Sequence, residues 1–236
     1  MAATEIADIP SLETMALSQT ANTNSISCHG EGNHQHDNGH DDGLSNIEQI
    51  DDDMIIPGIK FVNYRDESQI DCVMRLVGRD LSEPYSVFTY RYFLHRYPQL
   101  CIFAVPVSNS EDGNHKSDKS DKPESEPEPI GCIVCKIDPE ENEEQDYEEP
   151  RLCGYIGMLA VDTSFRRSGI GSALVKRAVR RMENMGCNSI MLETEVSNKA
   201  AMRLYEEMLG FMREEFLVRY YLNNNDAYRL RLWLKE

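Results

Sequence analysis

The chain has 236 residues, of which 40% are hydrophobic, and a formal net charge of −17 at pH 7. An acidic total argues against nucleic-acid binding, and no apolar run reaches the roughly 18–20 residues that cross a bilayer. The N-terminus also lacks the basic and apolar regions of a signal peptide, so we expect a cytosolic, cytoplasmic location.

The negative charge is concentrated in three segments. Residues 1–58 hold 11 acidic residues and no Lys or Arg, residues 108–129 hold 7 acidic residues against 3 Lys, and residues 138–150 hold 8 acidic residues and no basic one. Together they carry −23, which leaves +6 on the remainder of the chain. We expect a disordered acidic tail at 1–58 and two disordered insertions within one domain at 59–236. A mildly basic domain suits an anionic ligand such as a nucleotide cofactor.

The seven cysteines are scattered, which fits reduced, buried thiols better than a disulfide framework. Cys132 and Cys135 have the spacing of a metal or redox pair, but residues three apart on a strand face opposite sides. Cys28 and the four His of the tail lie in an Asn- and Asp-rich tract without fixed geometry. No metal site is predicted.

Up to residue 161, apolar and β-branched runs alternate with two helical patterns. The second helical pattern stops before Pro98. The three strands after it can form a meander, because the acidic segments separate them as loops. The expected elements are a strand Ile59–Tyr64, helices Ser68–Arg79 and Ser86–Tyr97, and strands Leu100–Val107, Ile130–Ile137 and Leu152–Val161.

After Val161 the apolar spacing becomes that of a helix, which begins at Ile170 and which Gly186 ends as a C-terminal cap. The remaining elements are a strand Asn188–Val196, a helix that Asn198 caps and that runs to about Met208, and a hairpin of Glu214–Leu222 with Ala227–Leu234 across residues 223–226. This order predicts an α+β fold, with a central mixed twisted sheet, helices on both faces and a C-terminal β-hairpin.

Gly169 and Gly171 open the helix after the strand that ends at Val161. A helix start presents N–H groups without intrahelical acceptors and the positive end of the helix dipole, and glycine lets the backbone approach an anion closely. The turn is not a Walker loop, which needs Gly-Lys-Ser/Thr, nor a dinucleotide fingerprint, which needs a small residue in place of Leu174. The pattern alone leaves open an anion site or a helix cap without a ligand.

The surroundings of this turn narrow the choice. Arg166-Arg167-Ser168-Gly169-Ile170-Gly171, between Met158–Val161 and Asn198–Tyr205, resembles the acetyl-CoA signature Arg/Gln-x-x-Gly-x-Gly/Ala of the GCN5-related N-acetyltransferase (GNAT) superfamily. Three further segments look like those of the NatC-type N-terminal acetyltransferase catalytic subunits: residues 80–86, residues 192–195, and residues 219–222 with Asp226-Ala227. The resemblance covers nearly all of 59–236 outside the acidic loops and implies the GNAT fold.

The resemblance also implies how acetyl-CoA is held. The strand backbone would pair with the pantetheine arm, the amides of residues 167–172 would surround the pyrophosphate, and the two arginines would add positive charge. The cofactor-binding residues expected on this basis are Leu159, Ala160, Val161, Arg166, Arg167, Ser168, Gly169, Ile170, Gly171, Ser172 and Asn198.

Glu193 and Tyr205 match the catalytic positions of the family. Glu193 would act as general base through a water, and Tyr205 would protonate the leaving thiolate as general acid. From the pattern alone, Glu193 could equally lie on a solvated strand face, and Tyr205 could be a core residue. Backbone N–H groups near Leu159 or Ala160 would polarise the thioester carbonyl.

The substrate expected from the resemblance is a protein N-terminus that begins with Met followed by a bulky apolar residue. Glu83 would accept hydrogen bonds from the amino group, apolar side chains would line the adjacent pocket, and two tyrosines would close the opposite wall. The residues concerned are Leu81, Glu83, Pro84, Tyr85, Tyr220 and Tyr221. A plain turn around Pro84 remains the alternative.

In this family the enzyme works on nascent chains near the ribosome, with a large scaffold subunit and a small Sm-like subunit as auxiliary partners. Two departures stand out: Gly157 replaces the usual Ala, and four residues instead of three separate Tyr205 from Gly210-Phe211. The extra helical residue would rotate the residues after it by about 100°. Two other functions therefore stay open, a lysine or small-amine acetyltransferase and a weakly active or non-catalytic scaffold.

Overall fold

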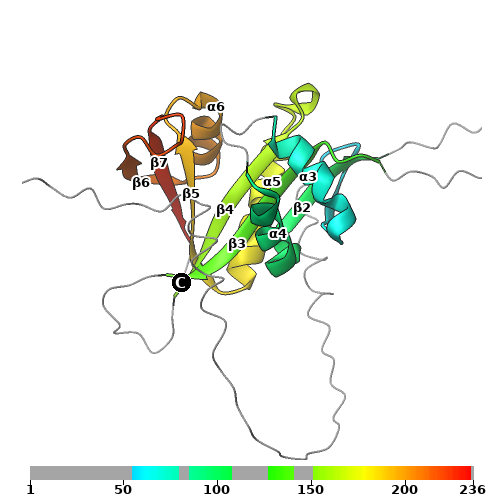
Figure 1. Ribbon diagram of the computed structural model, residues 1–236, viewed down its shortest axis with the longest axis horizontal. Coiled ribbons are helices and arrows are strands. Elements are labelled where there is room, and N and C mark those ends of the chain that lie inside the picture. The colour runs from blue at the N-terminus through cyan, green and yellow to red at the C-terminus, as the bar shows by residue number, and fades with distance from the viewer. Residues whose placement is uncertain (1–54, 80–84, 108–126, 141–150, 235–236) are drawn as a thin grey trace, which may run out of the picture.

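The computed structural model describes residues 55–79, 85–107, 127–140 and 151–234. Its centre is a seven-stranded mixed sheet in the order β1-β2-β3-β4-β5-β7-β6, antiparallel except between β4 and β5 (Figure 1). The strands are β1 (Ile59–Asn63), β2 (Cys101–Pro106), β3 (Gly131–Pro139), β4 (Leu152–Val161), β5 (Cys187–Glu195), β6 (Met212–Leu217) and β7 (Ala227–Trp233). The predicted meander is the β2-β3-β4 part of this sheet.

Helices cover both faces of the sheet, as predicted (Figure 1). The short 3-10 turns are η2 (Glu67–Gln69), η3 (Pro98–Leu100) and η4 (Thr163–Phe165). One face packs on α3 (Ile70–Val77) and α4 (Val87–Arg96), and the other packs on α5 (Ile170–Asn184). Each helix presents an apolar stripe to its own core, so the sheet separates two hydrophobic clusters. Cys132 belongs to the first cluster and Cys135 to the second, which confirms that these two thiols face opposite sides.

The edges of two acidic segments are ordered. β3 continues through Pro139 because it keeps pairing with the start of β4, and the Glu140 carboxylate lies 2.8 Å from Arg231 of β7. The predicted boundary at residue 138 is therefore too early. At the other segment, Ile56 forms a bridge with Ile59 and packs on the core of the α5 side. Residues 1–54, 108–126 and 141–150 lie outside the described part of the chain, and their disorder stays a prediction.

The helix after β5 differs from the predicted regular α-helix. It begins as α6 (Lys199–Met202) and continues as a π-helix, η5 (Arg203–Met208). The hydrogen bonds of a π-turn span five residues instead of four. The turn therefore accommodates an extra residue, and the residues after it are not rotated by the full angle of about 100° that one more α-helical residue would add. The Phe211 N–H then donates to the Tyr205 carbonyl at 2.9 Å. The four-residue spacing to Gly210-Phe211 is thus absorbed within the helix.

The C-terminal hairpin has a longer connection than predicted. β6 ends at Leu217 and β7 begins at Ala227, so residues 218–226 form a loop, which we call the tyrosine loop because it carries Tyr220 and Tyr221. Arg219 has a left-handed backbone, with φ of 52°, and this conformation ends the strand.

Candidate active site

β4 and β5 run parallel and then separate. They pair from Leu152 opposite Cys187 to Tyr155 opposite Met191, and the described residues contain no pair between them beyond that point. β4 stays bound to β3 on its other side as far as Val161. The far halves of β4 and β5 therefore form two walls of an opening in the sheet.

A cavity of about 1120 Å³ fills this opening and reaches from the start of α5 to the tyrosine loop. Its volume slightly exceeds the range of roughly 300–1,000 Å³ found for small-molecule sites, which suits an elongated ligand. The predicted site residues that line it are Leu159, Val161, Arg166, Arg167, Gly169, Gly171, Ser172, Asn198, Glu193, Tyr205, Tyr85, Tyr220 and Tyr221.

The other predicted site residues are not brought into the cavity lining. Ala160 and Ile170 have buried side chains, so they can contribute to a ligand site only through their backbone. The Ser168 hydroxyl is turned to the Phe165 carbonyl, to which it donates at 2.5 Å. Residues 81–84, which include the predicted Leu81, Glu83 and Pro84, lie outside the described residues.

The turn before α5 is shaped by two left-handed residues, Arg167 with φ of 62° and Gly169 with φ of 88°. In the α-helical ladder after this turn, the Ala173 N–H donates to the Gly169 carbonyl at 2.9 Å. The N–H groups of residues 170–172 precede that bond and point out of the helix start. Together with the helix dipole they form a site for an anion such as a pyrophosphate.

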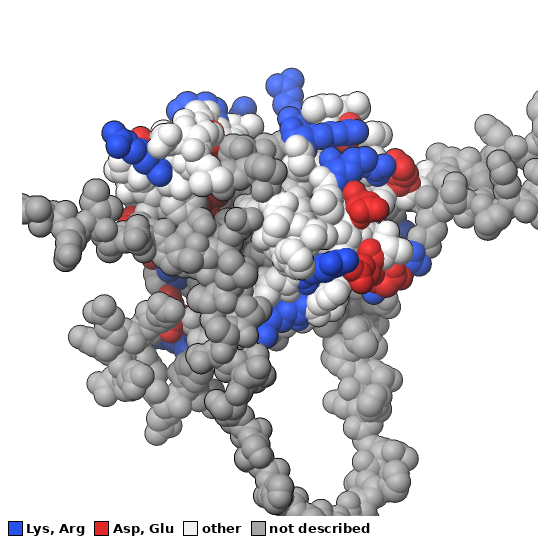
Figure 2. Space-filling model, viewed as in Figure 1, with Lys and Arg blue, Asp and Glu red and all other residues white. Residues whose placement is uncertain are grey.

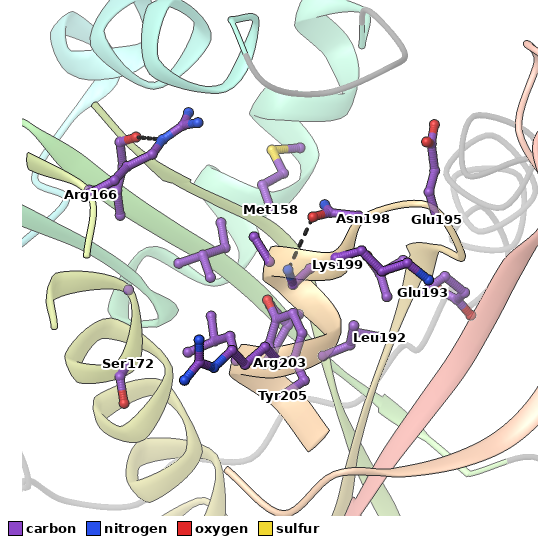
Figure 3. Close-up of a pocket in the computed structure, with 18 of the residues that line it drawn as sticks. Met158, Arg166, Ser172, Leu192, Glu193, Glu195, Asn198, Lys199, Arg203 and Tyr205 are labelled. Atoms are coloured by element: carbon purple, nitrogen blue, oxygen red, sulfur yellow. Dashed lines mark hydrogen bonds between the residues drawn. The ribbon is translucent and has the colours of Figure 1, made fainter. Parts of the chain in front are cut away.

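Basic side chains surround this end of the cavity. They gather over the turn that precedes α5 and the nearby end of α3 (Figure 2), and those in the lining are Arg79, Arg166, Arg167, Lys199 and Arg203. The Arg166 Nε donates to the Val161 carbonyl at 3.0 Å, which ties the turn to the end of β4 (Figure 3). A ligand that pairs with this edge of β4 would use the backbone groups before that carbonyl.

Asn198 is the N-cap of α6, as predicted. Its Oδ1 accepts from the Ala201 N–H at 3.1 Å (Figure 3). Because the oxygen is used in the cap, the amide Nδ2 is the atom of this side chain that could donate to a ligand.

Glu193 has a side chain that is only 5% exposed, although it lines the cavity. Its Oε1 accepts from the Arg229 Nε at 2.9 Å, and its Oε2 accepts from the Tyr155 hydroxyl at 2.9 Å. Burial and the nearby Glu193 carboxylate raise the pKa of Tyr155 well above its usual value, so Tyr155 stays a hydrogen-bond donor. The carboxylate is therefore fixed at both oxygens.

Glu193 belongs to a polar row that crosses five strands. Its members are directly opposed residues except between β4 and β5, where Tyr155 lies opposite Met191 and its hydroxyl donates to Glu193. Lys136 of β3 lies opposite Tyr155 of β4, with its Nζ 5.3 Å from the ring centroid. Arg229 of β7 lies opposite both Glu193 of β5 and Glu215 of β6, and its Nη1 donates to Glu215 at 2.7 Å. Cations and carboxylates thus alternate along the row, and each charge lies next to one of opposite sign or next to an aromatic ring.

Tyr205 lies in the π-helix and lines the same cavity as Glu193 of β5 (Figure 3). Its ring is buried against Phe211, with the two centroids 5.4 Å apart. Burial, with a smaller contribution from Cys135, raises the pKa of Tyr205 above its usual value. The phenol is therefore protonated at neutral pH, as a general acid must be. It is also a core residue, which confirms the core interpretation, and the role of Tyr205 as general acid stays a prediction.

The end of the cavity near the hairpin is aromatic. Tyr85, Tyr155, Tyr220 and Tyr221 all line it, and the rings of Tyr220 and Tyr221 meet edge to face with centroids 5.1 Å apart. Aromatic rings with polar tips suit an apolar side chain next to a polar peptide backbone.

Sequence reasoning does not identify Tyr155 or Arg229 as site residues. Complementary charge across the predicted hairpin, with Glu215 on one strand and Arg229 on the other, is a signal that could have found Arg229. Tyr155 has no comparable signal, because its contact with Glu193 depends on how β4 and β5 are paired.

The described helices include none that is long and apolar enough to cross a membrane. Within the same residues, no group of three or more His, Cys, Asp or Glu side chains has the arrangement of a metal site. The six described cysteines are all free thiols.

Comparison with known proteins identifies the family. The model of the acetyltransferase (GNAT) family matches residues 75–211. N-alpha-acetyltransferase 30 of Xenopus laevis is 45% identical to this chain over 177 residues, which are 75% of this chain and 55% of that protein. N-alpha-acetyltransferase 30 of Saccharomyces cerevisiae is 46% identical, and the match covers 75% of this chain and 88% of that protein. A crystal structure of the NatC complex bound to Gag peptide and CoA matches with a TM-score of 0.60 and 44% identity, covering 75% of this chain and 99% of that one.

The shared length differs among these relatives. The chain spans about half the length of the vertebrate relatives that it matches. The family match, the splayed parallel strands and the glycine turn at a helix start agree with one another, and the chain belongs to the acetyltransferase (GNAT) family, in the branch of the N-alpha-acetyltransferase 30 proteins.

Proposed function

We propose that the protein transfers the acetyl group of acetyl-CoA to the α-amino group of protein N-termini. The observation that carries this proposal is one cavity that is lined by the glycine turn at the start of α5, by Glu193 and Tyr205, and by the tyrosine loop. The relative at 44% identity was solved as a NatC complex with a peptide and CoA, which supports the same reaction here. The cytosolic setting, the ribosome proximity and the auxiliary subunits belong to the same proposal.

The lining residues fit acetyl-CoA. Its phosphates match the N–H groups of residues 170–172 and the basic side chains around them, and a Cβ at Gly171 would meet no atom closer than 3.8 Å. The pantetheine arm would lie along the unpaired edge of β4 near Leu159. When bound, acetyl-CoA supplies an activated acetyl thioester for the amine to attack.

The chain's own residues would manage two protons. An α-amino group has a pKa near 8 in model peptides, so a base needs only to remove a proton from a group that is already partly neutral. Because both oxygens of Glu193 are bonded within the protein, a water is the natural carrier between the amine and this carboxylate. Tyr205 would donate its proton to the departing sulfur.

The preferred substrate in this proposal begins with Met followed by a bulky apolar residue. The aromatic end of the cavity supports an apolar first side chain, and the predicted roles of Leu81, Glu83 and Pro84 belong to the same proposal. A lysine side chain would reach the same cavity with a longer and thinner chain, which the tyrosine wall would contact less.

The test is acetyl transfer from labelled acetyl-CoA by the full chain, with and without auxiliary subunits. A Met-Leu peptide should be acetylated faster than an otherwise identical peptide with a blocked N-terminus and one internal Lys. Glu193→Gln and Tyr205→Phe should each lower kcat, by about 10²–10⁴-fold if proton transfer is lost. Faster modification of the Lys peptide would make the protein a lysine acetyltransferase. No transfer to either peptide, with CoA still bound, would make it a scaffold.

A further inference from the structure

The tyrosine loop, residues 218–226, is attached to the domain with little apolar burial. Val218 is 68% exposed and Leu222 is 78% exposed. Hydrophobic packing of these side chains therefore cannot hold the loop against the cavity. Tyr220 and Tyr221 of this loop are half-buried and line the cavity, and polar contacts of the loop help to fix their position.

Hydrogen bonds within the loop fix its shape. The Arg219 N–H donates to the Asp226 Oδ1 at 2.7 Å, and the Asn224 N–H donates to the Tyr221 carbonyl at 2.8 Å. A further bond at 2.9 Å joins the Asn225 N–H to the Asn223 Oδ1. These bonds make the loop a compact unit, but they do not tie it to the cavity wall.

Glu195 supplies that tie from the end of β5. Its Oε1 accepts from the Asn223 Nδ2 at 3.1 Å, and its Oε2 accepts from the Asn225 Nδ2 at 3.3 Å. Glu195 lies opposite Ala227 in the sheet, at the point where the loop returns to β7. One carboxylate therefore holds two asparagine side chains of the loop with charge-assisted hydrogen bonds.

Glu195 and Glu193 share a face of β5, but their carboxylates point in different directions (Figure 3). The Glu193 carboxylate turns to Arg229 inside the sheet, and the Glu195 carboxylate turns to the loop. The two acidic residues thus have separate contacts, although only one residue separates them in the sequence.

From this geometry we propose that Glu195 is a positioning residue for the peptide site: it holds the tyrosine loop in place and thereby sets the affinity for the first side chain of the substrate. The inference rests on the proposed N-terminal acetyltransferase function. The substrate class is a peptide with a free α-amino group and a large apolar first residue, whose side chain packs on Tyr220 and Tyr221.

The first test is the kinetics of Glu195→Ala in the full chain with a Met-Leu peptide. We expect KM for the peptide to rise about tenfold, which corresponds to about 1.4 kcal/mol. We expect kcat to change by less than about twofold and KM for acetyl-CoA to stay the same, because neither the base nor the anion site is altered. Amides of residues 218–226 should exchange faster with solvent in this variant.

The second test separates positioning from direct contact with the substrate. Asn223→Ala combined with Asn225→Ala should reproduce the KM increase, and adding Glu195→Ala should change it no further, because all three act through one contact. Glu214→Ala is the matched control. It removes a carboxylate and one ion pair, with Arg231, from the same hairpin, outside the cavity lining.

An additive increase in the triple variant would mean that Glu195 binds the peptide itself and would overturn the inference. A fall in kcat at unchanged peptide KM would overturn it as well. Absence of acetyl transfer by the wild-type chain would instead reject the proposed function, so the two failures are distinguishable. The exposed asparagine variants keep the test available if Glu195→Ala does not fold.

Discussion

Replacing Arg229 by methionine tests the fixed position of Glu193. The Glu193 side chain is 5% exposed and that of Arg229 is 24% exposed, so the pair is largely buried. Removing one partner of a buried pair typically costs about 3–5 kcal/mol, because the other charge is left without compensation. Tyr155 still donates to Glu193 and Arg229 is partly solvated, so we expect the lower end, about 3 kcal/mol. The contact with Glu215, which is 48% exposed, adds at most about 0.5 kcal/mol.

Urea unfolding of the full chain measures this loss, and a double-mutant cycle assigns it. Glu193→Gln removes the charge that Arg229 compensates, so Arg229→Met should cost much less in that background. A coupling free energy of about 1–3 kcal/mol is expected between the two sites. Arg229→Lys, which keeps the charge but not the geometry of the guanidinium, should fall between Met and wild type. Costs that simply add would refute the view that the buried charge pair is the cause.

Two further predictions concern buried groups. Gly157→Ala would bring a Cβ to 2.9 Å from the ring of Phe93, so it should destabilise the fold by about 1–3 kcal/mol. Phe93→Leu should recover part of that loss. Equal losses in the wild-type and Phe93→Leu backgrounds, measured by thermal unfolding, would contradict the clash. Since burial raises the pKa of Tyr205 above its unfolded value of about 10, its contribution to stability is complete below pH 10 and falls as the pH rises beyond it. Tyr205→Phe should therefore make the alkaline decline in unfolding free energy shallower, as urea midpoints at several pH values would reveal, whereas an unchanged slope would mean that Tyr205 titrates normally.

The local signals in the sequence were sufficient for most of the elements and for the glycine turn at the start of α5. Asn198 caps α6 and Gly169 precedes α5 as expected, because such signals depend on residues within a few positions. The polar row was not predictable in this way. Its members come from five strands, and a contact such as that of Tyr155 with Glu193 depends on the register of β4 and β5.

The two departures from the family pattern also have different explanations in three dimensions. Gly157 gives room to the Phe93 ring, a neighbour that is distant in sequence. The extra residue after Tyr205 was expected to rotate the residues that follow it, but a π-turn contains it. Helical periodicity alone cannot predict this, because it assumes that every turn has the same number of residues.

Because of the π-helix, the segment from Asn198 to Gly210 should tolerate insertions and deletions differently before and after Tyr205. From Asn198 to Tyr205 each residue sets the angle at which the phenol enters the cavity, and one insertion there would turn it by about 100°. After Tyr205 the segment can gain a residue by widening a turn, and the π-helix of this chain, Arg203–Met208, includes that tyrosine and the three residues after it. During divergence of the family, insertions and deletions should therefore accumulate after the tyrosine and be eliminated before it. An alignment of relatives should accordingly open its gap between Glu206 and Gly210.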